Sequence, residues 1–356
     1  MAQNTVYSGR EFQVFVNTDD VSSGVGTFNS ATDATWLQVD VDSVSFPSFS
    51  PIQEFEMRTG SGRVASFDNV FTTDKRVTTE FSLSGRVDAA TLVVFVENVT
   101  GTASATDKVS IPTSYSPSSP ARAGAIADAT TYEKTLSFYF AAPGGASVDD
   151  SYKLKGCVCT SLSLSADMDT ASGRFQFDAT FQTQDPVTKG AVATTSMTGI
   201  NATKVFLPDL TTKTITLTGT VAEAAIDALW TSVSFSIEQP SQFLGATGTD
   251  AECEVIARGL PETTFTMSGS VKYDANTDQI VESFRAANAN NAVAIHLANA
   301  AEDTGTFDSG ATGIGFDITK GKFTSAEVSP DDLAMITFEV KALDDGTNNV
   351  CEILVA

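Results

Sequence analysis

The sequence predicts a mainly β protein that contains two copies of one strand-rich unit, each with a short helix at its side. Of the 356 residues, 42% are hydrophobic and only 18% are charged, and Thr, Ser, Ala, Gly and Phe are abundant. This composition is typical of a folded, β-rich chain. In addition, residues 81–87 (Phe-Ser-Leu-Ser-Gly-Arg-Val) return nearly unchanged as residues 265–271 (Phe-Thr-Met-Ser-Gly-Ser-Val).

The repeated stretch has the period of a β-strand. In both copies Phe, then Leu or Met, then Gly, then Val occupy alternate positions, and small polar residues or Arg lie between them. Such alternation indicates a strand with one buried face. Each copy leads into a segment that we expect to form a short helix, residues 88–98 in the first copy and 276–287 in the second. Neither copy contains a recognisable catalytic centre, so the unit looks like a building block.

The first elements follow the same logic. Residues 6–16 alternate loosely and predict a strand, and residues 17–35, rich in Asp, Ser, Gly and Thr, predict an exposed hairpin loop. The next strand region, 36–46, ends in Ser-Val-Ser-Phe at 43–46, and the same tetrapeptide stands at 232–235. The two tetrapeptides start 189 residues apart (43 to 232), close to the 184 residues (81 to 265) between the copies of the repeated stretch.

Two long segments of the first half are expected to be loops. Residues 60–71 contain Gly-Ser-Gly-Arg and precede the strand 77–87. Residues 99–131 are rich in Thr, Ser and Ala and carry Pro112, Pro117 and Pro120. Because proline cannot sit within a central strand, we expect a loop there. A loop of this length inside a compact domain is usually functional or a contact arm.

Further matches occur in the same order in both halves. A strand at 136–140 has its counterpart at 293–297. A hairpin pattern at 162–168 and 175–181 has its counterpart at 323–327 and 336–340. We infer an internal duplication whose copies join near residues 205–217.

The expected domains are therefore residues 1–215, which carry the long insertions, and residues 216–356. Ala222, Ile226 and Trp230 stand at helical spacing, so residues 221–230 are expected to form a short helix that packs on the core.

The charge argues against a nucleic-acid grip. The formal net charge is −23, from 44 acidic and 21 basic residues. The part through Ile215 carries 23 acids and 15 bases, which leaves 21 acids and 6 bases for the rest. Neither part has the basic surface that phosphate neutralisation needs. A strongly acidic surface favours solubility and repels a polyanion that passes close by.

The chain contains no stretch of about eighteen consecutive apolar residues, so no membrane span is expected. The start, Met-Ala-Gln-Asn-Thr, lacks a basic region followed by an apolar run, and we expect synthesis in a cytoplasm.

The four cysteines do not make a disulfide framework, and we expect buried or idle thiols. They are Cys157, Cys159, Cys253 and Cys351. The glycosylation patterns at Asn98 and Asn201 are attributed to chance.

The search for catalytic chemistry yields no catalytic, cofactor-binding or metal-binding residues. The single histidine, His296, lies between Ile295 and Leu297 and is expected to be an ordinary strand residue. Residues 274–278 have the acid spacing of a calcium loop but lack its glycine and final glutamate, so helix capping by Asn276 or Thr277 explains them better. The glycine-rich residues 310–315 lack the context of a nucleotide loop. We expect Asp149-Asp150 and Asp331-Asp332 to be solvated turns, and the protein not to be an enzyme.

The ordered pattern resembles the tail tube proteins of long-tailed bacteriophages. The resemblance rests on the 43–46 strand, the turn Gly-Arg-Val-Ala-Ser at 62–66, the strand 77–87, the helix 88–98 and the hairpin around 175–181, with their second-half copies. It covers most of the chain but depends on pattern and order.

The resemblance implies two tandem tail-tube-like β-sandwich or barrel domains, each with a short flanking helix. Their inner sheets would join those of neighbouring subunits into a β-lined ring, and long loops would reach the next ring. A duplicated domain implies a trimer with six quasi-equivalent domains, with a hexamer as the other possibility. Implied partners are the tape measure, terminator and baseplate proteins of a virion tail. DNA would pass through the channel without specific binding, and no cofactor is implied.

Two other function classes stay open at this point. A capsid decoration protein or an adhesin module would also be acidic, rich in Thr and poor in motifs. A carbohydrate-active β-sandwich enzyme would need two close carboxylates in a groove lined by exposed aromatic residues. The presence of only two tryptophans, Trp36 and Trp230, argues mildly against the enzyme.

Overall fold

The computed structural model of the chain describes residues 12–18, 36–46, 52–55, 70–73, 79–100, 108–111, 135–143, 150–183, 187–190, 192, 197–200, 206–219, 224–244, 255–258, 264–286, 291–298, 314–330, 333–343 and 350–355. This part of the chain is mainly β, as predicted. Eighteen strands join one large sheet, and two further strand pairs form separate two-stranded sheets. Of the strand pairs described, β12–β2 is parallel and the others are antiparallel.

The elements fall into two series. The first comprises β1 (Gln13–Thr18), β2 (Trp36–Gln38), β3 (Val41–Ser45), β4 (Ile52–Phe55), β5 (Val70–Thr73), β6 (Thr79–Arg86), α1 (Ala89–Thr100), β7 (Lys108–Ile111), β8 (Leu136–Ala141), β9 (Tyr152–Asp167), β10 (Gln176–Thr183), β11 (Thr188–Lys189) and β12 (Met197–Thr198). The second comprises β13 (Thr212–Thr218), β14 (Ala224–Asp227), β15 (Trp230–Glu238), β16 (Ser241–Leu244), β17 (Val255–Arg258), β18 (Thr264–Lys272), α2 (Asp278–Arg285), β19 (Ala292–Ala298), β20 (Ile314–Ser329), β21 (Met335–Ala342) and β22 (Cys351–Val355). Neither helix has the length and apolarity of a membrane span.

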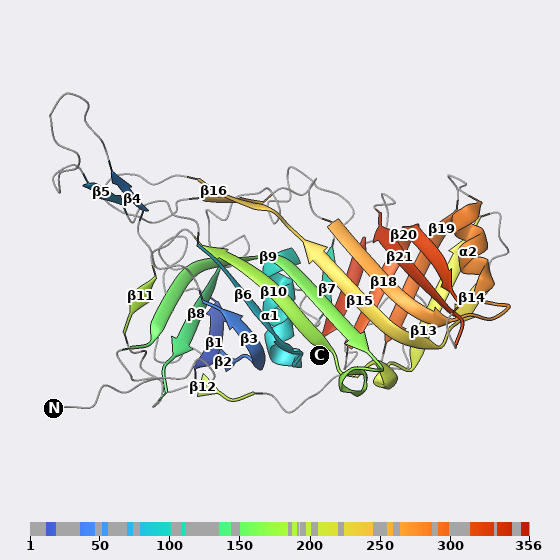
Figure 1. Cartoon of the computed structure of the whole chain (residues 1–356), viewed down its shortest axis with the longest axis horizontal. Coiled ribbons are helices and arrows are strands. Elements are labelled where there is room, and N and C mark those ends of the chain that lie inside the picture. The colour runs from blue at the N-terminus through green and yellow to red at the C-terminus, as the bar shows by residue number, and fades with distance from the viewer. Residues whose placement is uncertain are drawn as a thin grey trace, which may run out of the picture.

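Eight strands cross the molecule as one continuous antiparallel array, which we call the central sheet. Their order is β3, β6, β10, β9, β15, β18, β21 and β20 (Figure 1). The repeated stretch supplies β6 and β18. In β6, Phe81 and Leu83 are buried, whereas Ser82 and Ser84 on the other face are partly exposed. The alternation read from the sequence therefore corresponds to one core face and one polar face.

The pairing order of the first series is repeated in the second. The array β3–β6–β10–β9 corresponds to β15–β18–β21–β20, the pairs β1–β2 and β1–β8 correspond to β13–β14 and β13–β19, and β8–β9 and β9–β11 correspond to β19–β20 and β20–β22. The register agrees as well. Gly85 lies opposite Phe177 in β6–β10, and Gly269 lies opposite Phe338 in β18–β21.

The two longest strands take part in two groups of strands each. β9 pairs through its first residues with β8 and through residues 158–165 with β10, and β20 divides in the same way between β19 and β21. Register shifts mark β-bulges in each of these pairings. A bulge increases the local twist and bends a strand, which lets one strand leave the central sheet and join the strands behind it.

One large hydrophobic core runs through both series, and a second, smaller cluster of five residues lies in the first series. In the first, the rings of Phe81, Phe138 and Phe181 pack together, with centroids 4.7 Å apart for Phe138 and Phe181. The ring of Phe316 in β20 packs against two aromatic rings. Its centroid lies 5.7 Å from that of Phe175, just before β10, and 5.5 Å from that of Phe235 in β15. The two series therefore share buried apolar surface, and the expected boundary between residues 215 and 216 falls within β13.

Both predicted short helices are present, and they begin with the same local structure. The N–H of Thr91 donates to Asp88 Oδ1 at 3.0 Å, and the N–H of Thr277 donates to Asp274 Oδ1 at 3.0 Å. The acceptor near α2 is thus Asp274, not Asn276 or Thr277 as the sequence led us to expect. Asp274 also accepts from the N–H of Asn276, at 2.9 Å, so this carboxylate closes a turn.

Three predicted elements are wrong in whole or in part. The loop expected at 60–71 ends in β5, which begins at Val70, and residues 60–69 lie outside the described residues. Residues 224–227, expected in a helix at 221–230, form β14, and Ile226 lies opposite Ile215 of β13. The apolar spacing that suggested a helix arises because Ile226 is buried beside β13 and Trp230 opens the next strand. The loop expected at 99–131 contains the end of α1 and the strand β7, which pairs with β22. The rest of that loop, and the loop at 17–35 apart from Asn17 and Thr18, lie outside the described residues.

The two glycines of the repeated stretch, Gly85 and Gly269, each have a neighbouring group in the place that a Cβ atom would occupy. A Cβ atom at Gly85 would overlap the backbone oxygen of Asp40, and one at Gly269 would overlap the ring of Trp230. A glycine is needed at this position in both copies because a neighbouring group lies too close for a side chain. The obstacle at Gly85 is backbone, whereas the obstacle at Gly269 is a side chain.

We predict that Gly85→Ala lowers the free energy of unfolding by about 1–3 kcal/mol, because the added methyl group must displace backbone. Gly269→Ala should cost less, since the Trp230 ring can shift. Urea unfolding measures both. Ser84→Ala, on the adjacent polar face, is the matched control and should change stability by less than about 0.5 kcal/mol. Equal losses at Gly85 and Ser84 would contradict the packing argument.

Candidate assembly interface

The polar face of the central sheet is covered by small hydroxyl side chains. They come from β6, β9, β10, β15, β18 and β21 and are partly or fully exposed. They are Ser82, Ser84, Ser161, Ser163, Ser165, Thr180, Ser232, Ser234, Ser236, Thr266, Ser268, Ser270 and Thr337. The pairing registers align several of them into rows, for example Ser163, Ser236 and Thr266.

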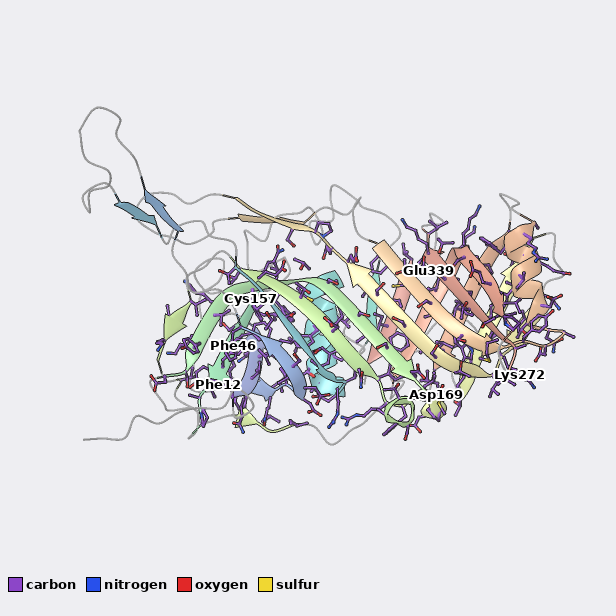
Figure 2. All side chains as sticks on the ribbon, in the orientation of Figure 1. Phe12, Phe46, Cys157, Asp169, Lys272 and Glu339 are labelled. Carbon is purple, nitrogen blue, oxygen red and sulfur yellow. The ribbon has the colours of Figure 1, made fainter. Side chains whose placement is uncertain are left out.

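Charged side chains are scattered over the same face. The acidic ones are Glu80, Asp167, Asp178, Glu238, Glu327 and Glu339, and the basic ones are Arg86, Lys272, Lys322 and Lys341. Figure 2 marks Glu339 toward the upper side and Lys272 toward the lower side of this sheet. Arg86 lies 3.6 Å from Asp42 in an exposed ion pair, whose stabilising effect is small. Arg86 and Ser270 occupy equivalent positions, so this position differs in charge between the two series.

The two series are joined inside the chain by strand pairing, which we call the internal joint. Residues 161–167 of β9 pair with residues 232–238 of β15 in seven successive positions. Leu164 and Phe235, directly opposite one another, are 1% and 2% exposed. The joint thus combines backbone hydrogen bonds with buried apolar contact.

The outer strands of the central sheet have no such neighbour among the described residues. β3 pairs there with β6 alone, and residues 325–329 of β20 pair with β21 alone. Apolar side chains are exposed at both edges, with Phe46 at 37% and Val328 at 40%. Figure 2 shows Phe46 beside Phe12, and the two ring centroids are 5.4 Å apart. An edge strand that has one neighbour in the described part of the sheet and carries exposed apolar side chains is a template for a further strand.

The two edges are the counterparts of the two sides of the internal joint. β3 corresponds to β15, and β20 corresponds to β9. Val44 of β3 lies opposite Leu83, as Phe235 lies opposite the equivalent Met267. Ala326 of β20 lies opposite Phe338, as Leu164 lies opposite the equivalent Phe177.

The identical tetrapeptides at 43–46 and 232–235 are not structurally equivalent. Val44 lies opposite Leu83, but Val233 lies opposite Gly269, which corresponds to Gly85. The match in sequence is thus displaced by two residues from the match in register. Both strands carry a one-residue irregularity, between Val41 and Ser43 in β3 and between Trp230 and Ser232 in β15.

Each series also sends out a separate hairpin. β4–β5 lies between β3 and β6 in the chain, and β16–β17 lies between the equivalent β15 and β18. Both hairpins lie on the upper side of the molecule (Figure 1). Neither pairs with the large sheet in the described part of the chain.

The residues singled out for chemistry occupy structural positions. His296 is 8% exposed, and its Nδ1 lies 3.1 Å from Oδ1 of the buried Asp317, whose Oδ2 accepts from Thr319 Oγ1 at 3.1 Å. The partner carboxylate was missed because Asp317 stands 21 residues away in sequence. Both Trp36 and Trp230 are buried.

The side chains of Cys157, Cys159 and Cys351 are buried, and the thiols of Cys157 and Cys159 donate to the carbonyl oxygens of Lys155 and Ser161. Cys253 lies outside the described residues. Within the described part of the chain, no three His, Cys, Asp or Glu side chains form a group that could hold a metal ion. Residues 310–313, Asp149 and Asp331-Asp332 also lie outside it.

A hollow on the polar face lies over the internal joint. Its lining is mainly hydroxyl side chains together with Asp167 and Arg174. Arg174 Nη2 lies 3.3 Å from Asp40 Oδ2, and this largely buried pair ties the start of β10 to the segment before β3. The hollow contains a single carboxylate and no exposed aromatic side chain among its lining residues.

We found no match between the chain and any family model or curated protein sequence.

The buried carboxyl group of Asp88 has a raised pKa. Burial raises the pKa of Asp88 above its ordinary value of 3.8, against the opposing effect of the hydrogen bonds from Thr91. A carboxyl group with a raised folded-state pKa contributes stability that is fully present below pH 3.8 and is lost as the pH rises through the folded-state pKa. Above that pH the helix cap carries a buried charge.

We predict that Asp88→Asn becomes more stable relative to the natural protein as the pH rises from about 3.5 to 7, because asparagine keeps an oxygen for the Thr91 N–H without a charge. Urea unfolding at several pH values measures this difference. Asp88→Ala, which removes the acceptor, should be about 1 kcal/mol less stable than Asp88→Asn throughout. A relative stability of Asp88→Asn that falls with pH would refute the assignment.

Proposed function

We propose that the protein is the subunit of a bacteriophage tail tube, which assembles into rings that stack around a channel for DNA. The observation that carries the proposal is the match between the internal joint and the two free edges. One β unit, used twice, is already joined to its own copy through β9 and β15. The remaining edges, β3 and β20, are the equivalents of those strands. The same joint can therefore form between chains.

The internal joint fixes the expected register between chains. Phe235 opposite Leu164 translates into Val44 of one copy opposite Ala326 of the next. Ser43 then faces Glu327, and Ser45 faces Ser325. The contact would cover the exposed Phe46 and Val328 and use the backbone groups of both edges. Repeating this head-to-tail contact with a closing rotation gives a ring.

A trimer is the ring order we favour. Each chain contributes eight strands to the central sheet, so three chains would give 3 × 8 = 24 strands and six quasi-equivalent units. The second unit then begins at β13, slightly before the boundary expected from the sequence. A hexamer of chains is the alternative. In either ring each unit is a β-sandwich with a helix at its side.

The hydroxyl-covered face of the central sheet is proposed to line the channel. Hydroxyl groups, and acidic side chains that outnumber the basic ones, give DNA phosphates little to bind. The acidic total charge of −23 acts in the same direction. A map of the assembled tube with a basic inner wall would contradict this part of the proposal.

The hairpins β4–β5 and β16–β17 are proposed to contact the adjacent ring. They leave equivalent places of the two units on one side of the sheet, so a closed ring would carry them all on one face (Figure 1). Tape measure, terminator and baseplate proteins would be the further partners in the virion tail.

The competing functions have weaker support. A capsid decoration protein or an adhesin module would not need matched free edges at both ends of a duplicated sheet. A carbohydrate-active enzyme would need paired carboxylates and exposed aromatics. Asp167 and Asp169 line a second hollow beside the one over the internal joint, but no exposed aromatic side chain is among the lining residues of either hollow. The buried Trp36 and Trp230 cannot stack on a sugar.

Electron microscopy of the purified full-length protein tests the function directly. Rings or tubes with a central channel are expected at high protein concentration. Isolated globules at every concentration and ionic condition would count against the tail tube and favour a decoration or adhesin module.

We predict that the double variant Ser43→Cys with Glu327→Cys forms disulfides between chains on mild oxidation, because directly opposed strand residues lie within bridging distance. Non-reducing gel electrophoresis should show linked dimers and closed rings. The pair Ser43→Cys with Ser325→Cys is the register control and should link poorly. Each single variant and the natural protein control for the native thiols. A preparation that forms tubes without linking 43 to 327 would disprove the register.

A further inference from the structure

The two helices begin alike but have different surroundings. After the equivalent aspartates Asp88 and Asp274, α1 packs against β9 and also against β7 and β22. The main described neighbour of α2 is β20, the counterpart of β9. Figure 1 shows α1 in the interior, between the two units, and α2 at the outer end of the molecule. The helix at the internal joint is thus covered on a side that the other helix leaves open.

The open side of α2 is charged where α1 is apolar. Counted from the capping aspartates, Leu92, Val96 and Val99 of α1 correspond to Asp278, Glu282 and Arg285 of α2. The three α1 side chains are at most 2% exposed. Glu282 and Arg285 are exposed and Asp278 is half-buried. Among the described residues the main contact of α2 is with β20, and the hydroxyl of Tyr273 donates to Asp278 Oδ1 at 3.1 Å.

The cover on α1 comes from β22 and the strand β7 paired with it. The counterpart of β22 in the first unit is β11, since both pair with the first residues of the long strand of their unit. Cys351 and Ile353 of β22 are buried at the internal joint. β11 consists of Thr188 and Lys189 alone, and both are exposed.

The flank around β11 carries a group of lysines. Lys189 places its Nζ 5.1 Å from the ring centre of Tyr152, and Lys153 and Lys155 of β9 are partly exposed close by. Lys153 lies opposite Thr188 in the strand pairing. In the second unit the positions of Lys153 and Lys155 are taken by Gly315 and Asp317, both buried. The basic character is therefore specific to the outer end of the first unit.

We propose that the acidic stripe of α2 in one copy docks on the lysine flank of β9 and β11 in the next copy. The step rests on the proposed ring, in which the internal joint is the template for the joint between chains. There α1 meets β22 through apolar side chains. Between chains the equivalent elements are α2 and β11, and Asp278 and Glu282 meet Lys153, Lys155 and Lys189.

The consequence is a difference in chemistry between the two kinds of joint. The joint within a chain is apolar at the helix and folds with the subunit. The joint between chains pairs opposite charges at the helix, which fixes the partner and the orientation more than it adds affinity. In a protein of net charge −23, a local group of lysines attracts an acidic neighbour.

The test is a charge exchange across the proposed contact, Glu282→Lys and Lys189→Glu. Both side chains are exposed, so each variant should fold with an unchanged melting temperature as a monomer. Sedimentation velocity measures the protein concentration at half assembly. Each single variant should raise this concentration about threefold to tenfold, and the double variant should return it toward the natural value. Lys341→Glu, the same charge change on the polar face of the central sheet, should leave it within about twofold.

The outcomes separate this inference from the proposed function. If the natural protein never forms rings, the tail-tube function itself fails. If rings form but neither single variant weakens assembly, or if the double variant remains as weak as the singles, the docking of α2 on the lysine flank is disproved while the ring stands.

Discussion

The structure depends on one constraint, that a strand with a neighbour on one side only is open to pairing with another chain. Within the chain the constraint is met by copying. The second unit repeats the strand order of the first, and β15 takes the place beside β9 that a separate subunit would otherwise fill. The edges that remain, β3 and β20, are defined by the same operation. An edge with exposed backbone and exposed Phe46 or Val328 is a liability in a monomer. It becomes useful when the complementary edge is on an identical chain.

The differences between the two units are concentrated where their surroundings differ. At the shared core the substitutions are conservative, such as Leu83 for Met267 on β6 and β18. At the helices an apolar stripe in α1 is replaced by a charged stripe in α2. At the long strands Lys155 stands where Asp317 pairs with the buried His296. A duplicated unit thus keeps the residues that its own fold needs and changes those that meet a neighbour.

Much of the fold could be predicted from the sequence because its signals are local. The alternation of Phe81, Leu83 and Gly85 with polar residues gave the strand and its buried face, and the run after Asp88 gave the helix. The failures came from contacts that sequence does not encode locally. The spacing of Ile226 and Trp230 fits a helix as well as two strands with a break between them. Residues 224–227 are a strand because they pair with β13. The identical tetrapeptides misled because the match in sequence is displaced by two residues from the match in strand register.

The candidate interface was less predictable for the same reason. Whether a strand lies at an edge depends on the whole sheet. The residues of β3 do not indicate by themselves that β6 is its one neighbour in the described sheet. Covalent fusion of two units changes how such an edge is used. In the proposed ring of six units from three chains, half of the joints would form during folding, at the high effective concentration of a tethered pair. Only the joints between chains then depend on protein concentration. Selection on the timing of assembly can therefore act on β3, β20, α2 and β11 alone, without weakening the fold.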